Sequence, residues 1–433
     1  MLKFSFNKAI KIIMLAFFLF QGLFSFRIVG PSITIQRFFL VIIYLWIFFN
    51  SNRQNDFWNS ISGKKYKVII SFYLFVCTYT AVFRGDFNTI FGVFVDCILM
   101  YLLFLYVLFY IESPESVLSL ICKIVSVACI LGIIEYITGF NLFNHLTFAN
   151  DIIPESLRDG ILRIRVAYGH PLAYGMFLVL FFPFCCYDFK NSRVYLFNRP
   201  ITLMLIIVNV LLTGSRSSIG VFGVELILIA IITARELKGK LLLTLIMVGV
   251  VGGFFFVAFL NNPFIQIVTR QIFYVVDELF DTQIAVDFGG DVSISSSSIA
   301  RERLWKIFNY PGMSPILGIG VTEKRSFYID NWMVTSVDNF YVNQYIKFAY
   351  PGVIATICMF AAYLWNCICA FKRYHSSIFL ICLISGAAYM VNLMFVDELA
   401  TMKYFFFLLA FTNVLIQNEG NLVVKCSNEA CKV

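Results

Sequence analysis

Long runs of apolar residues alternate with short polar segments along most of the chain. Most of these runs approach the ~20 residues that an α-helix needs to cross the ~30 Å hydrocarbon core of a bilayer. We therefore predict an all-α polytopic membrane protein with about twelve transmembrane helices. The predicted spans are residues 9–26, 32–49, 66–83, 89–110, 117–138, 170–187, 200–214, 217–234, 241–260, 348–371, 376–395 and 402–417.

Two longer polar stretches interrupt this pattern and divide the chain into four parts. Residues 1–138 hold the first five spans, and residues 139–260 hold a first outer loop and four further spans. Residues 261–347 form a large loop between the ninth and tenth spans, and residues 348–433 hold the last three spans and a tail. Long connections are usually functional or disordered, so the large loop is the first place to look for function.

The large loop has a pattern of its own. Residues 270–280 predict an amphipathic helix, and residues 289–298 are a Gly- and Ser-rich segment that is expected to be flexible. Residues 300–308 predict a second helix, and residues 318–320 predict a tight turn.

Composition agrees with a membrane protein, because 60% of the residues are hydrophobic and 13% are charged. Soluble domains carry about 25% charged residues. Lys3, Lys8 and Lys11 precede the first apolar run, but no small-residue cleavage site follows it. We expect an uncleaved first span rather than a signal peptide.

Lys and Arg in the short loops set the expected orientation. Bases at the N-terminus and in alternate short loops place both termini in the cytoplasm, with the base-free segment 111–116 as the exception. The two long loops then face outward, and their bases are mostly Arg. The net charge of +8 forms no continuous basic stripe, so we expect no nucleic-acid partner.

An Arg-rich outer face indicates an anionic ligand, because the guanidinium pairs bidentately with phosphate. The alternative is local ion pairing with the acids of the same loops. These acids are Asp151, Glu155, Asp159 and Glu302.

The cysteines do not form the pattern of a disulfide scaffold. Ten lie in or beside apolar runs, and Cys426 and Cys431 lie in the C-terminal tail. Free Cys behaves as a small hydrophobe, and a C-x4-C spacing without His is a weak metal signal. We expect reduced thiols and neither a cofactor nor a metal.

The first candidate constellation closes the first outer loop, where Arg163 and Arg165 precede His170 and Pro171. Pro171 suits the first turn of a helix, where its missing N–H costs nothing. His170 then stands at the membrane surface beside two arginines. It either contacts a phosphate or a sugar hydroxyl, or caps the helix.

The second constellation is Ser215-Arg216, between two apolar spans on the outward side. A charged group at that depth usually faces a polar cavity or a partner. The alternative is a guanidinium that reaches up to lipid phosphates.

The third constellation lies in and after the large loop. Arg301 and Arg303 are followed by Asp338, Asn339 and Tyr341, which lead into the next span. Asp338 suits a helix cap, because a carboxylate accepts free N–H groups there. It also suits a general base, and the two roles are compatible.

Three acids lie inside predicted spans, namely Asp96, Glu135 and Glu225. Intramembrane acids are a functional signal by default. They suit a proton-coupled transporter, and they equally suit ion pairs with the outer arginines.

The three constellations, in this order, resemble the bacterial superfamily of O-antigen ligases and O-antigen polymerases, which act on polyprenyl-linked glycans. Those proteins show an Arg-containing loop before a Gly-His-Pro span start, a Ser-Arg pair, a Pro-x-x-Gly-x-Gly segment and a His-Asn or Asp-Asn pair in a large periplasmic loop. The matching positions are Arg163, Arg165, Gly169, His170, Pro171, Ser215, Arg216, Pro315, Gly318, Gly320, Asp338, Asn339, Tyr341 and Gly352.

The resemblance implies an inverting, metal-independent glycosyltransferase that joins undecaprenyl-pyrophosphate-linked repeat units at the periplasmic face of the bacterial inner membrane. It implies that Arg163, Arg165, Arg216 and Arg301 stabilise the leaving pyrophosphate, Arg216 and Arg301 as catalytic residues, and that Asp338 is the catalytic base. The implied substrate-binding residues are Arg163, Arg165, His170, Arg303, Asn339 and Tyr341. The expected partners are lipid-linked oligosaccharides, the membrane and a chain-length regulator protein.

One departure from the family pattern favours a polymerase. The ligases carry His before the Asn, whereas this chain carries Asp338. The alternatives are a ligase that transfers the finished polymer to a lipid acceptor, and a transporter or flippase without chemistry.

Overall fold

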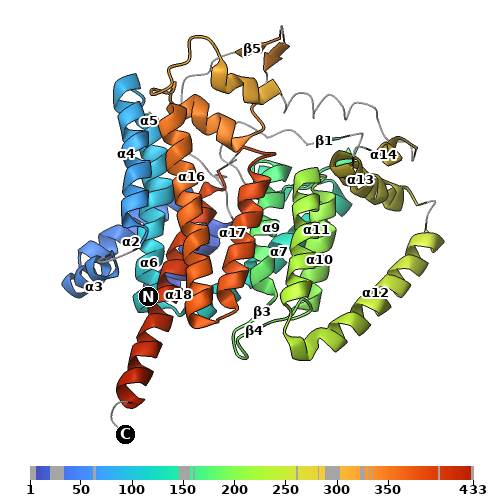
Figure 1. Cartoon of the computed structure of the whole chain (residues 1–433), viewed down its shortest axis with the longest axis horizontal. Coiled ribbons are helices and arrows are strands. Elements are labelled where there is room, and N and C mark those ends of the chain that lie inside the picture. Colours follow the sequence, from blue (N-terminus) through green and yellow to red (C-terminus); the bar gives the residue numbers. More distant parts are fainter. Residues whose placement is uncertain are drawn as a thin grey trace.

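The computed structural model describes residues 6–19, 34–61, 65–145, 157–158, 161–259, 262–280, 282–287, 303–321, 327–330, 332–334, 336–397 and 400–430. The chain is mostly helical, and most of its helices pack into a bundle with the large loop at one end, called the loop end below (Figure 1). The helix of residues 238–258 stands away from this bundle and is mostly exposed (Figure 1). The elements up to the first outer loop are α1 (Phe6–Leu19), α2 (Ile35–Phe48), α3 (Ser51–Ile61), α4 (Lys67–Arg84), α5 (Phe87–Phe91), the π-helix η1 (Gly92–Leu99), α6 (Met100–Tyr106), the π-helix η2 (Val107–Ile111), α7 (Pro114–Thr138) and α8 (Leu142–His145).

The second half of the chain adds helices and short hairpins. Three antiparallel hairpins pair β1 with β2, β3 with β4, and β5 with β6, the last with Phe327 opposite Val334. The elements are β1 (Leu157–Arg158), β2 (Ile161–Leu162), α9 (Pro171–Cys185), β3 (Tyr187–Asp188), β4 (Arg193–Val194), α10 (Pro200–Leu212), α11 (Arg216–Ile232), η3 (Arg235–Leu237), α12 (Lys238–Ala258), α13 (Pro263–Phe280), α14 (Ile284–Asp287), η4 (Trp305–Asn309), β5 (Phe327–Ile329), β6 (Trp332–Val334), α16 (Phe340–Tyr374), α17 (Ile378–Asn392) and α18 (Met402–Ala430).

A helix lies at each predicted span, as far as the described residues cover it. Within that part of the chain, five helices are long and apolar enough to cross a membrane, or six if α2 and α3 form one bent span. The all-α polytopic class is therefore confirmed. The number of twelve is not, because α9, α10 and α17 are apolar but shorter.

The second predicted span ends in a sharp bend. The chain turns by 109° between α2 and α3, a polar helix that the apolar pattern did not predict. Asn50 starts the new helix, since its side-chain oxygen accepts the backbone N–H of Arg53 at 3.1 Å. The Arg53 guanidinium then lies 4.2 Å from the ring centroid of Phe6, which ties α3 to the start of α1.

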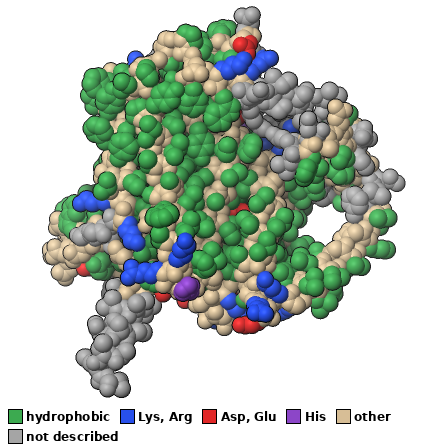
Figure 2. Space-filling model, in the orientation of Figure 1, with side chains coloured by type: hydrophobic (Ala, Val, Ile, Leu, Met, Phe, Trp, Pro, Cys, Tyr) green, Lys and Arg blue, Asp and Glu red, His purple; other side chains and the backbone are tan. Residues whose placement is uncertain are grey.

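The outer surface of the bundle is broadly apolar. Figure 2 shows a continuous hydrophobic face with Lys and Arg side chains at its two ends. Large side chains such as Val68, Ile201 and Phe254 are exposed. Soluble monomers rarely expose apolar patches above a few hundred Å², so this face indicates contact with lipid.

The core is formed where α9 and α18 run between the other helices. α9 has an almost uniformly buried apolar sequence, as expected for a helix surrounded on all sides. The rings of Phe18 and Tyr404 stack at 5.9 Å, and Phe181 and Phe407 pack against Phe18 edge-on. This aromatic core fixes the start of α18 beside the end of α1 and the second half of α9.

The large loop docks onto a break in α16. Ala349 has non-helical dihedral angles, and Pro351 has no N–H to donate to the carbonyl of Lys347. The N–H of Gly320 donates instead to that carbonyl oxygen at 3.0 Å, and the N–H of Ile319 donates to the carbonyl oxygen of Ile346 at 2.9 Å. The Pro-x-x-Gly-x-Gly segment therefore satisfies backbone groups that the broken helix leaves open.

Two sequence predictions for this region are corrected. Residues 318–320 form no tight turn but an irregular segment along α16, because the open carbonyls of the helix accept the N–H groups of residues 319 and 320. α16 begins at Phe340 rather than at 348, because the helix continues, with its break, on both sides of Ala349.

The remaining predictions for the large loop concern two helices and a Gly- and Ser-rich segment. The amphipathic helix at residues 270–280 is confirmed as part of α13, which packs against α11. The described part of the helix at 300–308 is also helical. Residues 289–298 lie outside the described residues.

Candidate functional site

The first outer loop returns to the turn between α10 and α11. The Nε–H of Arg163 donates to the carbonyl oxygen of Thr213 at 2.8 Å, and the N–H of Ile164 donates to that of Leu212 at 3.2 Å. Gly214, next in the turn, has φ +58°, and a Cβ there would lie 3.2 Å from the Arg163 Nε. The turn thus needs glycine both for its backbone angle and for its contact with Arg163.

Arg216 is the first residue of α11, directly after this turn. The Ser215 side chain caps the helix by accepting the N–H of Ser218 at 3.3 Å. The Arg216 side chain is buried at 7% exposure, and its guanidinium lies 4.9 Å from the ring centroid of Tyr274 in α13. Arg163 and Arg216, which are far apart in sequence, therefore flank one turn at the loop end.

His170 caps α9, as one of the two alternatives predicted. Its Nδ1 accepts the N–H of Leu172 at 3.2 Å, and Pro171 occupies the first helical turn. α9 lies close to α11 because Gly175 leaves no room for a Cβ, which would lie 2.6 Å from the Ser218 Oγ. That close approach brings the start of α9 beside the start of α11.

Electrostatics join His170 to the third constellation. Burial lowers the pKa of its imidazole, and the charges of Arg163 and Arg165 lower this pKa further. The carboxylate of Asp338 acts in the opposite direction and raises the pKa of His170. His170, from the first constellation, is thus within electrostatic reach of Asp338, from the third.

Asp338 is exposed and is not the helix cap. Its Oδ1 accepts the hydroxyl of Ser336 at 2.6 Å. The cap of α16 is Asn339, whose Oδ1 accepts the N–H of Val342 at 3.1 Å and whose Nδ2 donates to the carbonyl of Met394 at 3.0 Å. The predicted capping role of Asp338 was therefore wrong by one residue, and its carboxylate faces solvent.

Several predicted substrate-binding residues have partners inside the fold. The hydroxyl of Tyr341 donates to the carbonyl of Met390 at 3.1 Å, so it joins α16 to α17 as Asn339 does. Arg165 is buried and donates to Asn144 Oδ1 at 2.9 Å.

The large-loop arginines lie elsewhere or outside the described residues. Arg303 is half-buried, and its charge, after that of Lys306, lowers the pKa of the exposed Asp330. Arg301 lies outside the described residues, as do Asp151, Glu155, Asp159 and Glu302, the acids considered as local ion-pair partners.

The intramembrane acids differ in their surroundings. Asp96 pairs with Arg37, whose Nε lies 2.8 Å from the Asp96 Oδ1, as the ion-pair alternative predicted. Glu135 accepts the N–H of Val166 at 2.7 Å and the side chain of Asn141 at 2.8 Å. Glu225 is fully buried, and neither of its oxygens has a hydrogen-bond partner among the described residues.

A cavity of about 450 Å³ begins at Arg216 and runs between α11, α13 and α17. Apart from Arg216, Ser217 and Glu225, its wall consists of apolar side chains and glycine. The cavity therefore combines a guanidinium at one end with an apolar channel. An amphipathic ligand with an anionic head fits this distribution of charge.

Residues 201–350 match a family model described as O-Antigen ligase. This match over part of the chain supports the superfamily of O-antigen ligases and polymerases. The matched segment runs from α10 to the break in α16, and it includes Arg216, Gly318 and Asp338. No curated protein matches the chain.

Members of this superfamily are enzymes of the glycosyltransferase type, so an O-antigen ligase or polymerase type of activity is supported for this protein. The family match covers the second and third constellations, while Arg163 and His170 precede it. The structure joins the two parts at the Thr213–Gly214 turn.

Sequence reasoning did not single out three residues that lie in a cavity or against a residue that lines one. Tyr274 lies under Arg216, while Gln344 and Lys403 line a second cavity. Lys403 carried a usable signal, because it is a base at the start of an apolar span. Nothing in the local sequence distinguished Tyr274 or Gln344 from other residues of amphipathic helices.

Proposed function

We propose that the protein is a glycan polymerase that joins undecaprenyl-pyrophosphate-linked oligosaccharide repeat units at the periplasmic face of the bacterial inner membrane. Its product would be a polysaccharide of the O-antigen or capsule type. The loop end of the bundle would face the periplasm, and both termini would lie in the cytoplasm. Asp338, in place of the His of the ligases, supports a polymerase over a ligase.

The observation that carries this proposal is the position of Arg216 at one end of the apolar cavity. A polyprenyl diphosphate has an anionic head and a long hydrocarbon tail. The head would contact Arg216, with Arg163 on the other side of the same turn, and the tail would follow the channel between α11 and α17. Arg301 remains part of the proposed clamp, although it lies outside the described residues.

The proposed reaction is an inverting substitution at the anomeric carbon of the donor chain. A hydroxyl of the acceptor sugar attacks this carbon from the face opposite the diphosphate, and the bond from the carbon to the phosphate oxygen breaks. Negative charge grows on the leaving diphosphate, where guanidinium groups stabilise it. The loss of one such donor typically costs about 3 kcal/mol in the barrier.

Asp338 would take the proton of the attacking hydroxyl, because its carboxylate is exposed at the loop end and held by Ser336. His170 suits this role less well. Its Nδ1 accepts the N–H of Leu172, so the neutral ring carries its proton on Nε2 and acts there as a donor. We therefore assign His170 to positioning, either of the diphosphate or of Asp338.

The proposal requires neither a nucleotide sugar nor a metal ion. The diphosphate linkage already carries the driving force of the transfer, and guanidinium groups supply the positive charge. Addition of EDTA should therefore leave the rate of polymer formation unchanged, whereas a metal-dependent reaction would stop.

Deletion of the gene tests the proposed function in the source bacterium. Loss of a polymerase should leave surface glycan that carries single repeat units. Loss of a ligase would instead leave no surface glycan and would accumulate lipid-linked polymer. Any result other than surface glycan with single repeat units contradicts the proposal.

Complementation with variants tests the assigned residues. Arg216→Ala should reduce polymer formation about 10²- to 10³-fold, and Lys372→Ala, an exposed base at the far end of α16, should not. A transporter would show another pattern, with Arg216→Ala and Asp338→Ala active and Asp96→Ala inactive.

A further inference from the structure

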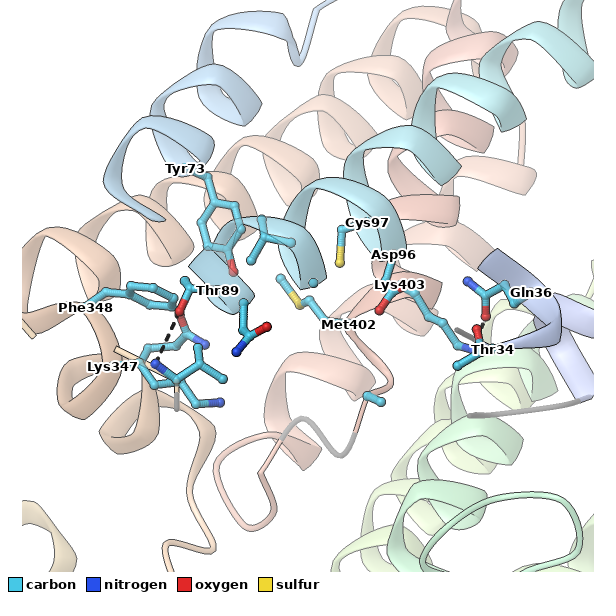
Figure 3. Close-up of a pocket in the computed structure, with 16 residues that line it drawn as sticks. Thr34, Gln36, Tyr73, Thr89, Asp96, Cys97, Lys347, Phe348, Met402 and Lys403 are labelled. Carbon is cyan, nitrogen blue, oxygen red and sulfur yellow. Dashed lines mark hydrogen bonds between the residues drawn. The ribbon is translucent and has the colours of Figure 1, made fainter. Parts of the chain in front are cut away.

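A second cavity, of about 220 Å³, lies between α2, η1, α16 and α18 (Figure 3). We call it the lysine pocket, after Lys403. Its mouth is formed by exposed residues, among them Asn88, Val321 and Ala400. Its floor is formed by buried polar side chains, so a ligand would enter from the loop end. The volume is far above what one water requires.

Lys403 provides positive charge at the floor. Its side chain is only 5% exposed, and its Nζ donates to the Oε1 of Gln36 at 3.0 Å. The rings of Phe17 and Tyr404 lie 5.0 and 5.2 Å from the Nζ. These contacts provide one hydrogen-bond acceptor, while an ammonium group has three N–H donors. A buried cation among apolar helices usually has a partner or a function.

Gln344 points independently to a ligand at the same floor. The residue is 1% exposed and lines the lysine pocket, and its Oε1 has no hydrogen-bond partner among the described residues. A buried polar group without a partner costs about 1–3 kcal/mol. Because an amide carries both a donor and an acceptor, it can bind an anion or a hydroxyl group.

The sign of the charge around the pocket favours an anion. Asp96 lines the pocket, and the Arg37 guanidinium binds both of its oxygens, at 2.8 and 2.5 Å. Lys347 lines the opposite wall on α16. A second acid, Asp86, lies beside the pocket, where its Oδ2 accepts the N–H of Val321 at 2.8 Å. Arg37, Lys347 and Lys403 together outnumber Asp86 and Asp96, so the local net charge is positive.

We propose that the lysine pocket is a phosphate-binding site, distinct from the site beside Arg163 and Arg216. Lys is a common phosphate ligand that acts as a point charge. A 180° rotation of the Gln344 amide, which exchanges its oxygen and nitrogen, would present its Nε2–H to a phosphate oxygen. Two sources of phosphate fit. One is the diphosphate of a second lipid-linked substrate, which rests on the proposed polymerase function. The other is the headgroup of a membrane phospholipid, and this source is independent of the proposed polymerase function.

Inorganic pyrophosphate is the probe that tests the phosphate chemistry. The full-length protein, in nanodiscs of phosphatidylcholine, should bind it saturably in calorimetric titration. Lys403→Met should weaken binding at the lysine pocket about 10- to 100-fold, as expected when a charged hydrogen bond is lost. Lys372→Met, at the exposed far end of α16, should leave binding unchanged.

Two further variants keep the test decisive. The Arg216→Ala protein should still show the pyrophosphate binding at the lysine pocket that Lys403→Met removes. This result separates the two sites whether or not the protein polymerises glycan. Gln344→Leu should also weaken binding, and it replaces Lys403→Met if that variant does not fold. Pyrophosphate binding that is equal in the wild type, Lys403→Met and Gln344→Leu would overturn the proposal.

The source of the phosphate is decided by a competition experiment. If the ligand is a substrate diphosphate, undecaprenyl diphosphate should displace pyrophosphate from Arg216→Ala protein. If it is a phospholipid, phosphatidylglycerol added to the nanodiscs should displace it instead, and native mass spectrometry should show this lipid retained by the wild type but not by Lys403→Met. Displacement by neither lipid contradicts a phosphate site open to the membrane.

Discussion

Arg163 donates its Nε–H to the carbonyl oxygen of Thr213 at 2.8 Å, which joins the first outer loop to the turn that begins α11. The contact holds one guanidinium beside that turn while Arg216 extends from its other end. Two positive charges from distant parts of the sequence are thereby placed beside one turn, and one of them, Arg216, lines the apolar cavity. The first prediction follows from the glycine between them.

Gly214→Ala should lower the rate of polymer formation, because the added Cβ would lie 3.2 Å from the Arg163 Nε. The Arg163 side chain must then shift by a few tenths of an ångström. Because a displacement of about 1 Å can cost about 100-fold in rate, we expect a smaller loss here. Gly139→Ala is the matched control, since Gly139 also has positive φ but has no atom within 4 Å of the added Cβ. Both variants should lose about 1 kcal/mol of stability, measured by thermal unfolding. An equal loss of activity in both would contradict the role of Arg163.

Stability should fall in mild acid because of His170. Burial, and then the charges of Arg163 and Arg165, lower its pKa in the folded protein below the ordinary value of 6.5. The unfolded chain therefore binds a proton first as the pH falls, so stability declines from about pH 6.5 down through the folded pKa. Above about pH 6.5, His170 is neutral in both the folded and the unfolded chain, so its titration no longer changes the free energy of unfolding.

His170→Asn tests this assignment, because Asn caps a helix well but does not titrate. Between pH 7.5 and pH 5, the melting temperature of the variant should fall less than that of the wild type. His170→Ala, which removes the cap, should be less stable than His170→Asn at both pH values. An unchanged acid decline in His170→Asn would mean that other groups cause it.

Asp338→Asn should reduce polymer formation about 10²- to 10⁴-fold, as expected for loss of a general base. Its thermal stability should stay close to that of the wild type, since Asp338 is exposed and Asn339 caps the helix. Ser336→Ala removes only the hydroxyl that donates to Asp338 and should keep most of the activity. Full activity of Asp338→Asn would exclude the carboxylate as the base.

Gly318→Ala should release the large loop from α16. An added Cβ would lie 2.1 Å from the carbonyl oxygen of Lys347, which is backbone and cannot rotate away. We expect a loss of about 2 kcal/mol or more and faster proteolysis of the loop. Gly239→Ala is the control, because a Cβ there meets no atom within 4 Å. A stable Gly318→Ala protein with a protected loop would contradict the docking described above.

The candidate site was partly predictable from sequence because some of its chemistry is local. Pro171 after His170 predicted a helix start, and Ser215 before Arg216 has the residue type of a cap. The choice between Asp338 and Asn339 as the cap was not predictable in this way. Both residues suit the position, and the contact of Asn339 with Met394 on α17 decides between them.

The lysine pocket was not predictable, because its parts come from distant segments. Gln36, Gln344 and Lys403 lie in three different helices, and each alone reads as a polar residue near the end of an apolar run. Only the packing of α2, α16 and α18 turns them toward one another.

The sequence by itself determined the all-α membrane class, the positions of most helices and the order of the motifs that mark the superfamily. These follow from the length and composition of single segments, which must satisfy their backbone hydrogen bonds within the bilayer as helices. Only the tertiary structure decided that Arg163 meets the turn before Arg216, and that the broken helix α16 binds the glycine segment of the loop. Such contacts depend on how distant surfaces fit together, and no local pattern of residues specifies that fit.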